Sequence, residues 1–159
     1  MVGATGDLAR RKLIPALYAR YRARQIPDGS RIIGTARTQQ TQDEFRSRVN
    51  EWLIEFAPNQ DAETVRKFLS TLDYISADAT SDAGWKAVAS RLGAANERVR
   101  AFYLSVAPRF FAPTAERIVN AEAGGEGCRI VVEKPLGHDL ASARKLNAQL
   151  SRHFDEEQI

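Results

Sequence analysis

A glycine-rich turn near the start of the chain has the composition of a phosphate-binding loop. Its residues are Gly3, Ala4, Thr5, Gly6, Asp7, Leu8, Ala9 and Arg10, and a helical pattern follows them. Gly3 can make the tight turn out of a strand, and Gly6 lets backbone N–H groups at a helix N-terminus approach a pyrophosphate. Ala9 is small enough for a helix and a strand to pack closely there. A turn without any ligand is the alternative, because the strict G-x-G-x-x-G spacing is absent.

A second candidate binding segment follows the next strand pattern, where the chain reads Thr35-Ala36-Arg37-Thr38 and contains no carboxylate. Dinucleotide-binding folds that take NAD usually place Asp or Glu there, to accept a hydrogen bond from the ribose 2′-hydroxyl. A guanidinium group instead matches the oxygens of a 2′-phosphate. Arg37 therefore favours NADP over NAD. An ordinary surface arginine is the alternative interpretation.

Lys134 and Pro135 form the third segment with chemical potential, at the end of the apolar strand pattern 129–133. Pro135 favours an extended backbone at Lys134. From the carboxyl end of a strand, the ammonium group can contact a substrate phosphate or hydroxyl, or the nicotinamide end of a dinucleotide. The alternative is a helix-entry turn in which Lys134 pairs with Glu133.

Alternating helix and strand patterns must position these segments. Strands are predicted at 31–35, 72–75, 99–105 and 129–133, and helices at 13–21, 45–56, 65–69, 85–92, 110–119 and 140–154, with turns at 58–61 and 124–127. Thr41 and Glu44 form a capping box, and Pro15 should kink the first helix or end its first turn. Ser81 or Asp82, and Asp139, should cap two later helices.

This alternation predicts an α/β fold, with strands that pair in parallel through right-handed crossovers. We expect a Rossmann-like, doubly wound, mostly parallel sheet in three α/β/α layers, with its first strand truncated to Met1 and Val2. Ligands of such sheets bind outside the carboxyl ends of the strands. The loops at those ends are residues 3–8, 35–38, 78–81, 105–108 and 134–137.

The composition is that of one globular domain. The chain has 159 residues, of which 43% are hydrophobic, and its 23 basic and 20 acidic residues leave a net charge of +3. These charges are scattered, which is typical of a solvated surface rather than a nucleic-acid interface. No apolar run reaches the roughly 18 residues of a membrane-spanning helix. The single cysteine, Cys128, fits a reducing, cytoplasmic location.

Four segments, in order, resemble motifs of the glucose-6-phosphate dehydrogenase family, in its bacterial form. Residues 3–12 read G-A-T-G-D-L-A-R-R-K, similar to G-A-S/T-G-D-L-A-x-x-K. Residues 31–37 resemble the family's second strand with its 2′-phosphate arginine, and residues 102–108 resemble its F-Y-L-x-x-x-P strand end. Residues 129–139 read R-I-V-V-E-K-P-L-G-H-D, similar to R-I-I/V-I/V-E-K-P-F/L-G-x-D. The resemblance covers essentially the whole chain.

The resemblance implies an NADP-binding domain over residues 1–159 of an enzyme of the oxidative pentose phosphate pathway. That enzyme oxidises D-glucose 6-phosphate to 6-phospho-D-glucono-1,5-lactone and passes hydride to NADP. By resemblance, Gly3–Arg10 would bind the cofactor phosphates, Arg37 the 2′-phosphate, and Asp78-Ala79 would flank the adenine. Lys134 would contact both the sugar phosphate and the cofactor, with Pro135 setting its pose.

The resemblance also implies parts that this sequence does not contain. The family's catalytic histidine lies in an R-I-D-H-Y-x-G-K segment, which we expect just after Ile159, and a C-terminal domain supplies sugar contacts and the dimer surface. His138 and His153 match no catalytic motif. We therefore expect no catalytic residue and no metal site in these 159 residues, and weak or no turnover by the isolated chain.

Three alternatives remain. The glucose-fructose oxidoreductase and inositol dehydrogenase family also has an E-K-P turn, but with a strict G-x-G-x-x-G. Extended short-chain dehydrogenases also begin with G-A-T-G, but they need Tyr-x-x-x-Lys, and no tyrosine here has a lysine four residues on. The third alternative is a non-catalytic NADP-binding fragment or sensor.

Overall fold

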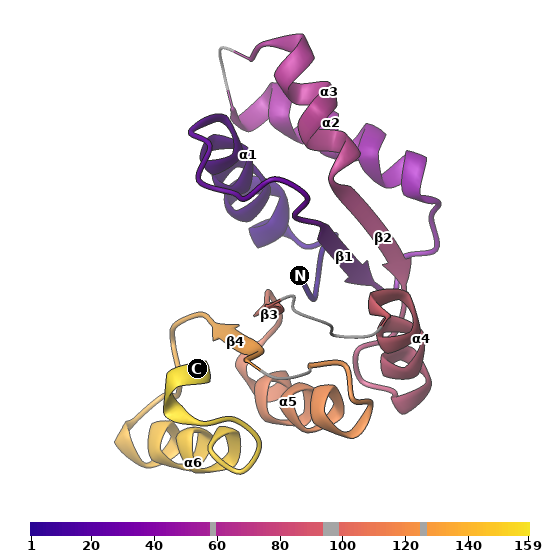
Figure 1. Ribbon diagram of the computed structural model, residues 1–159. Helices are drawn as coiled ribbons and strands as arrows, with labels where there is room; N and C mark the ends of the chain where they lie inside the picture. Colours follow the sequence, from indigo (N-terminus) through magenta and orange to yellow (C-terminus); the bar gives the residue numbers. More distant parts are fainter. Residues whose placement is uncertain (58–59, 94–98, 125–126) are drawn as a thin grey trace. The chain divides into compact units, whose positions relative to one another are not determined.

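The computed structural model divides the chain into two compact units (Figure 1). One unit is Gly3–Ser76, and the other combines Met1–Val2 with Ala77–Ile159; we call them the N-terminal unit and the C-terminal unit. The structure describes residues 1–57, 60–93, 99–124 and 127–159. Residues 58–59 and 125–126, which belong to two predicted turns, lie outside the described residues.

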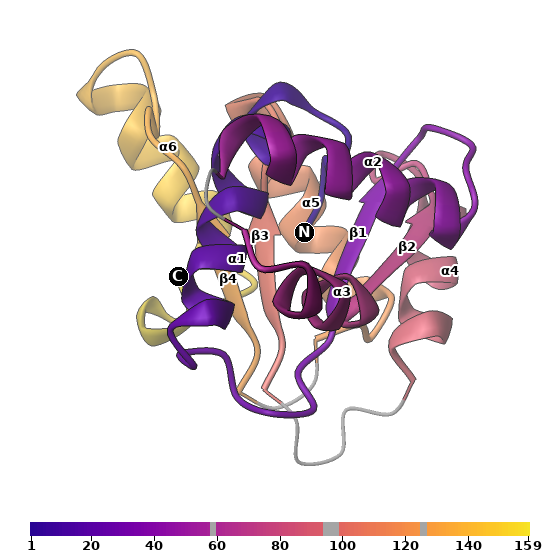
Figure 2. The same ribbon diagram turned by 90° about the horizontal axis from the view of Figure 1, so that it is seen from above.

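The N-terminal unit is a parallel strand pair with its helices. In chain order its elements are a π-helical turn η1 (Ala9–Leu13), α1 (Ile14–Arg22), β1 (Ile32–Ala36), α2 (Gln42–Phe56), α3 (Ala62–Ser70) and β2 (Leu72–Ser76). The strands pair from Ile32 opposite Leu72 to Ala36 opposite Ser76. Helices α2 and α3 both contact β2, and the two views of the ribbon agree on this (Figures 1 and 2). The carboxyl ends of β1 and β2 therefore lie side by side.

Local signals determine where these helices begin. The predicted capping box is present at α2: the Glu44 N–H donates to Thr41 Oγ1 at 3.2 Å, and the Thr41 N–H donates to Glu44 Oε2 at 2.6 Å. The Asp61 side chain caps α3 by accepting a hydrogen bond from the Thr64 N–H. The predicted disturbance at Pro15 takes the form of the π-helical turn just before it, where the Ile14 N–H bonds to the Ala9 carbonyl. Pro15 lacks an N–H, so regular helical bonding cannot be complete there.

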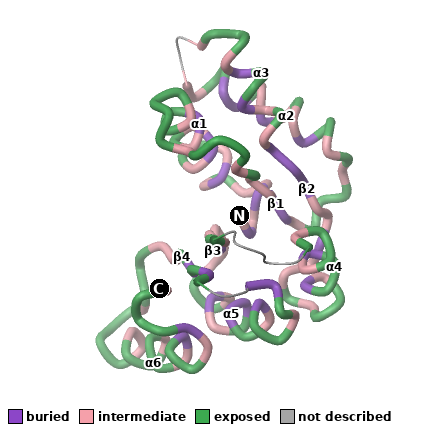
Figure 3. Tube along the Cα trace, viewed as in Figure 1, coloured by how far each residue is buried: buried purple, intermediate pink, exposed green. Residues whose placement is uncertain are grey.

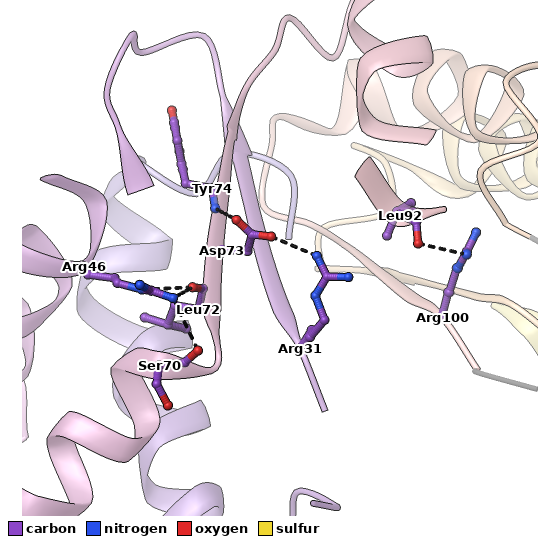
Figure 4. Close-up of polar contacts among 8 residues, drawn as sticks. All are labelled: Arg31, Arg46, Ser70, Leu72, Asp73, Tyr74, Leu92 and Arg100. Carbon is purple, nitrogen blue, oxygen red and sulfur yellow. Dashed lines mark hydrogen bonds and ion pairs between the residues drawn. The ribbon is translucent and has the colours of Figure 1, made fainter. Parts of the chain in front are cut away.

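Arginine side chains secure the start of both strands of the N-terminal unit (Figure 4). Arg46 of α2 donates to the carbonyl oxygens of Ser70 and Leu72, where α3 turns into β2. Arg31, just before β1, pairs with the buried carboxylate of Asp73 at 2.8 Å. These contacts satisfy polar groups that would otherwise be costly to bury.

The C-terminal unit contains a second parallel pair. Its elements are α4 (Asp82–Leu92), β3 (Ala101–Leu104), the 3-10 turn η2 (Pro108–Phe110), α5 (Phe111–Asn120), β4 (Arg129–Val132), α6 (Leu140–Leu150) and the 3-10 turn η3 (Glu156–Gln158). Strand β3 pairs with β4 from Ala101 opposite Arg129 to Leu104 opposite Val132. Val2 forms a single parallel bridge with Leu104, which is all that the described chain contains of the predicted first strand. Ser81 and Asp139 cap α4 and α6, as predicted.

Two predicted elements are longer than the observed ones. The strand predicted over 99–105 is limited to Ala101–Leu104, and Val99 lies outside it with 70% of its surface exposed. The last helix ends at Leu150, yet Phe154 is buried and its N–H bonds to the Leu150 carbonyl. An apolar residue four positions on is compatible with both a helix and a turn that folds back, so periodicity alone could not separate them.

Each unit has its own buried core (Figure 3). The N-terminal unit buries large side chains from its helices and from β2, including Tyr18, Phe45, Leu53, Phe68 and Leu72. The C-terminal unit buries Trp85, Leu104, Phe111, Ile118 and Ile130. The predicted α/β class with parallel strand pairing is confirmed.

Candidate dinucleotide-binding site

The glycine turn lies directly against β1 in the N-terminal unit. Gly3 adopts a positive φ of 84°, and the N–H groups of Gly3 and Ala4 both donate to the Thr35 carbonyl, at 2.9 and 3.1 Å. Gly34 makes this approach possible. A Cβ at residue 34 would lie 2.8 Å from Ala4 Cβ and 3.0 Å from the Phe45 ring. Because Gly34 has no side chain, the turn can lie close to the end of β1.

The turn leads into a helix whose first N–H groups are available to a ligand. Helical geometry begins at Asp7, and the Arg10 N–H is bonded to the Gly6 carbonyl. No side chain caps η1, and the Asp7 carboxylate pairs instead with Arg11 at 2.7 Å. The first N–H groups of a helix have no partner within the helix, and they carry its positive dipole end. This end of the helix can therefore bind an anion.

Gly6 keeps the turn open toward that helix end. A Cβ at Gly6 would come within 3.2 Å of the Gly3 carbonyl oxygen, which is closer than most real Cβ contacts. Ala9 is fully buried, as its predicted packing role requires. Small residues, a positive φ and an uncapped helix start together fit a phosphate group better than a hydrophobic ligand.

The loop that carries Arg37 is held beside the glycine turn. Thr5 Oγ1 lies 3.2 Å from Thr38 Oγ1, within hydrogen-bond distance. The Tyr74 hydroxyl donates to the Thr38 carbonyl at 2.7 Å and lies 3.2 Å from the Ala36 carbonyl. Arg37 itself is exposed, and its side chain forms no hydrogen bond or ion pair within the part of the chain that the structure describes. Its guanidinium group can therefore bind an external anion.

Arg10 has a different environment from the one expected for a phosphate ligand. Its guanidinium group pairs with Glu55 and lies 5.3 Å from the centre of the Phe56 ring, at the end of α2. Arg11 also lies over Phe56, at 5.6 Å. In this structure the Arg10 side chain anchors the first helix to α2, and only its backbone belongs to the glycine turn.

In the C-terminal unit, the Asp78-Ala79 turn is fixed on the start of α4. Asp78 Oδ1 accepts from the N–H and the hydroxyl of Thr80, at 2.8 and 2.7 Å, and Trp85 Nε1 donates to the Ala79 carbonyl at 2.9 Å. A Cβ at Gly84 would lie only 2.1 Å from the Asp78 carbonyl oxygen. Backbone, cap and indole contacts thus give this turn one defined shape.

Lys134 follows β4, and the Lys134–Pro135 peptide bond is cis. Lys134 is exposed and forms no ion pair with any described residue. A Lys134–Glu133 ion pair, the alternative interpretation, does not occur among the described residues, and the Glu133 carboxylate accepts a hydrogen bond from the Tyr103 hydroxyl of β3. Burial and the Glu133 carboxylate raise the pKa of Tyr103 to about 12. The ammonium group of Lys134 is therefore free to meet a ligand.

The two histidines have structural surroundings. The His138 N–H donates to Ser142 Oγ, next to the Asp139 cap, and the His138 side chain is exposed. His153 lies in the turn after α6 and not in its last helical turn, because α6 ends at Leu150.

A separate groove in the N-terminal unit contains none of the predicted site residues. It lies between α2 and α3, encloses about 670 Å³, and is lined by polar side chains such as Asp43, Arg46 and Asn50 beside Val65 and Leu69.

Comparison with known proteins decides the family. The family model described as "Glucose-6-phosphate dehydrogenase, NAD binding domain" matches residues 1–159. The glucose-6-phosphate 1-dehydrogenase of Rhizobium meliloti is 44% identical over 160 residues, which cover 99% of this chain and 32% of the relative. The chain belongs to the glucose-6-phosphate dehydrogenase family. It spans about a third of the length of the curated relatives that it matches.

Solved structures of this family agree with the fold described above. The X-ray structure of glucose-6-phosphate 1-dehydrogenase from Mycobacterium avium matches with a TM-score of 0.90 and 35% identity, over 99% of this chain and 34% of that one. A glucose-6-phosphate dehydrogenase in complex with its substrate glucose-6-phosphate matches with a TM-score of 0.84 and 32% identity, over the same shares. The family match favours the expected glucose-6-phosphate dehydrogenase family over the glucose-fructose oxidoreductase and inositol dehydrogenase family and over the extended short-chain dehydrogenases.

Sequence reasoning missed the residues that support the candidate site. Gly34 interrupts a strand pattern, and a glycine in a strand can mark a close approach of backbone, so a signal was present. Tyr74 and Tyr103 had no such signal, since their roles depend on which strands are neighbours.

No helix in the described part of the chain is long and apolar enough to cross a membrane.

Proposed function

We propose that this chain is the NADP-binding part of a glucose-6-phosphate dehydrogenase, which oxidises D-glucose 6-phosphate to 6-phospho-D-glucono-1,5-lactone. NADP supplies the hydride acceptor when it is bound. One observation carries the cofactor assignment: the glycine turn and the Arg37 loop are joined, through Thr35 and through Thr5 and Thr38. This juxtaposition supports a ligand that has both a pyrophosphate and a 2′-phosphate.

The glycine turn would bind the pyrophosphate mainly through its backbone. Gly3–Ala9 supply the open turn and the uncapped helix start, whose positive dipole end attracts phosphate oxygens. Arg10 remains in the proposal as a backbone member of this segment, since its side chain contacts Glu55.

Arg37 would distinguish NADP from NAD. Its exposed guanidinium group has no partner among the described residues, and the segment 35–38 has no carboxylate for a ribose 2′-hydroxyl. A guanidinium group beside a 2′-phosphate forms strong, charge-assisted hydrogen bonds.

The remaining roles lie in the C-terminal unit. The rigid Asp78-Ala79 turn would flank the adenine, and Lys134 would contact the sugar phosphate and the cofactor, with Pro135 setting its pose. The free ammonium group of Lys134 supports its part of this assignment.

Oxidation of a sugar hydroxyl also needs a base that removes the hydroxyl proton. Neither His138 nor His153 matches the family's catalytic motif, so the 159-residue chain alone should bind NADP without turnover. The three-layer Rossmann-like arrangement, the cytoplasmic location and homo-oligomerisation through the family's C-terminal domain belong to the same proposal.

Calorimetric titration of the 159-residue chain with NADP and with NAD tests the cofactor assignment. Wild type should prefer NADP, and Arg37→Ala should weaken NADP binding about 10- to 100-fold, while it leaves NAD binding unchanged. Arg66→Ala is the matched control, because it removes the same charge from an exposed site on α3. Equal affinity of wild type for the two dinucleotides would contradict the proposal.

A further inference from the structure

We propose that Tyr74 is a positioning residue for cofactor choice: its hydroxyl holds the Arg37 loop in the conformation that accepts a 2′-phosphate. This inference rests on the proposed function. The hydroxyl donates to the Thr38 carbonyl at 2.7 Å and lies 3.2 Å from the Ala36 carbonyl. The two carbonyls are on either side of Arg37. The one hydroxyl proton is directed mainly to the nearer Thr38 carbonyl, so the side chain fixes the backbone just after the guanidinium-bearing residue while it packs close to the backbone just before it.

The loop needs such a support because the strand pairing ends before it. Strand β1 ends at Ala36, which is opposite Ser76 in the register, and residues beyond Ala36 have no ladder partner among the described residues. Buried or partly buried carbonyl groups require a donor. The Tyr74 hydroxyl supplies that donor from the neighbouring strand.

The Tyr74 side chain is itself rigidly held. Only 7% of its surface is exposed, and its ring lies 4.8 Å from the ring of Phe45, which is fully buried. Tyr74 is opposite Gly34 in the register, and the Phe45 ring also packs on Gly34. Figure 4 shows the ring pointing away from the Asp73–Arg31 pair, as expected for successive residues of a strand. The hydroxyl therefore occupies one defined position.

Thr38 links this support to the glycine turn. Its backbone carbonyl accepts from Tyr74, and its hydroxyl lies 3.2 Å from the Thr5 hydroxyl. The distance between the proposed 2′-phosphate and pyrophosphate subsites is thus set before a ligand arrives. Because binding then needs less ordering of the loop, the affinity for NADP is higher. NAD makes no use of the guanidinium group and should not benefit.

The test compares two tyrosine-to-phenylalanine substitutions in the same unit. Tyr74→Phe should weaken NADP binding by the 159-residue chain about fivefold, a typical loss for one neutral hydrogen bond, with NAD binding unchanged. Tyr18→Phe is the matched control. Tyr18 is also buried, and its hydroxyl has no hydrogen-bond partner among the described residues. It should leave the NADP-to-NAD ratio as in wild type.

A double-mutant cycle with Arg37→Ala separates positioning from a general structural effect. If Tyr74 acts through Arg37, Tyr74→Phe should have no further effect on NADP affinity in the Arg37→Ala background. Hydrogen exchange without any ligand gives a second measurement. The amides of residues 35–39 should exchange faster than in wild type in Tyr74→Phe, and at the wild-type rate in Tyr18→Phe.

The outcomes distinguish this inference from the proposed function. Equal loss of NADP and NAD affinity in Tyr74→Phe, or an unchanged ratio, would overturn the positioning role while the Arg37 assignment stands. If wild type shows no preference for NADP, or no binding at all, the proposed function fails and the inference fails with it.

Discussion

Both units of the chain hold the segment after a strand by a tyrosine hydroxyl on the neighbouring strand, but the acceptors differ. In the N-terminal unit, the Tyr74 hydroxyl donates to the main-chain carbonyl of Thr38, just after Arg37, and lies 3.2 Å from that of Ala36, just before it. In the C-terminal unit, Tyr103 donates to the carboxylate of Glu133, next to Lys134. The first contact fixes a backbone, whereas the second fixes a side chain and involves a charge. A bond to a charged acceptor is generally the stronger of the two.

The units also differ in how glycine brings their loops close. Gly34 lets two side chains, those of Ala4 and Phe45, approach the β1 backbone, whereas Gly84 lies against a backbone carbonyl, that of Asp78. Side chains can shift more easily than backbone. The Asp78-Ala79 turn should therefore tolerate change less well than the glycine turn.

The largest expected effect follows from this difference. Gly84→Ala should destabilise the protein by about 3 kcal/mol and Gly34→Ala by about 1–2 kcal/mol, since overpacking at an immovable neighbour costs more. Chemical unfolding followed by circular dichroism measures both. Ala83→Gly, at an exposed position of the same helix, controls for the change in helix propensity. A smaller loss of stability in Gly84→Ala than in Gly34→Ala would contradict this difference between the two glycines.

A smaller effect is expected at the carboxylate contact. Tyr103→Phe removes the donor to Glu133 and should lower the free energy of unfolding by about 1 kcal/mol, after allowance for partial exposure. Glu133→Gln keeps an acceptor and should cost less. If Tyr103→Phe is as stable as wild type, the Glu133 contact does not contribute to stability.

The smallest expected change is in the pH dependence of stability, and it appears only at alkaline pH. The pKa of Tyr103 is raised from 10.0 to about 12, so the folded protein holds this proton more tightly than the unfolded chain. Its contribution to stability is complete below pH 10 and is lost as the pH rises toward 12. Tyr103→Phe should therefore flatten the decline of stability over that range. An unchanged slope in Tyr103→Phe would contradict the assignment.

Local features of the fold could be predicted from the sequence. The capping box of Thr41 and Glu44, the cap at Asp139 and the turn at Gly3 each depend on residues a few positions apart. The parallel pairing of the strands could also be predicted, because helices alternate with strands along the chain. The predicted strand start at Val99 and the predicted helix through Phe154 were wrong, because apolar periodicity does not show where a regular element stops.

Support of the candidate site was the part that sequence reasoning could not reach. The contact of Tyr74 with Thr38 follows from the register of β2 on β1, which no local pattern encodes. The pairing of Arg10 with Glu55 likewise joins residues far apart in the chain. Identities of ligand-facing residues are local information, whereas the contacts that hold them are long-range.

A nuclear magnetic resonance titration of the 159-residue chain with NADP and NAD tests the central claim most directly. Both dinucleotides should shift the amide signals of Asp7 and Leu8, because both carry a pyrophosphate for the glycine turn. Only NADP should shift the side-chain Nε signal of Arg37. A shift of Arg37 Nε by both dinucleotides to the same extent, or by neither, would contradict the account.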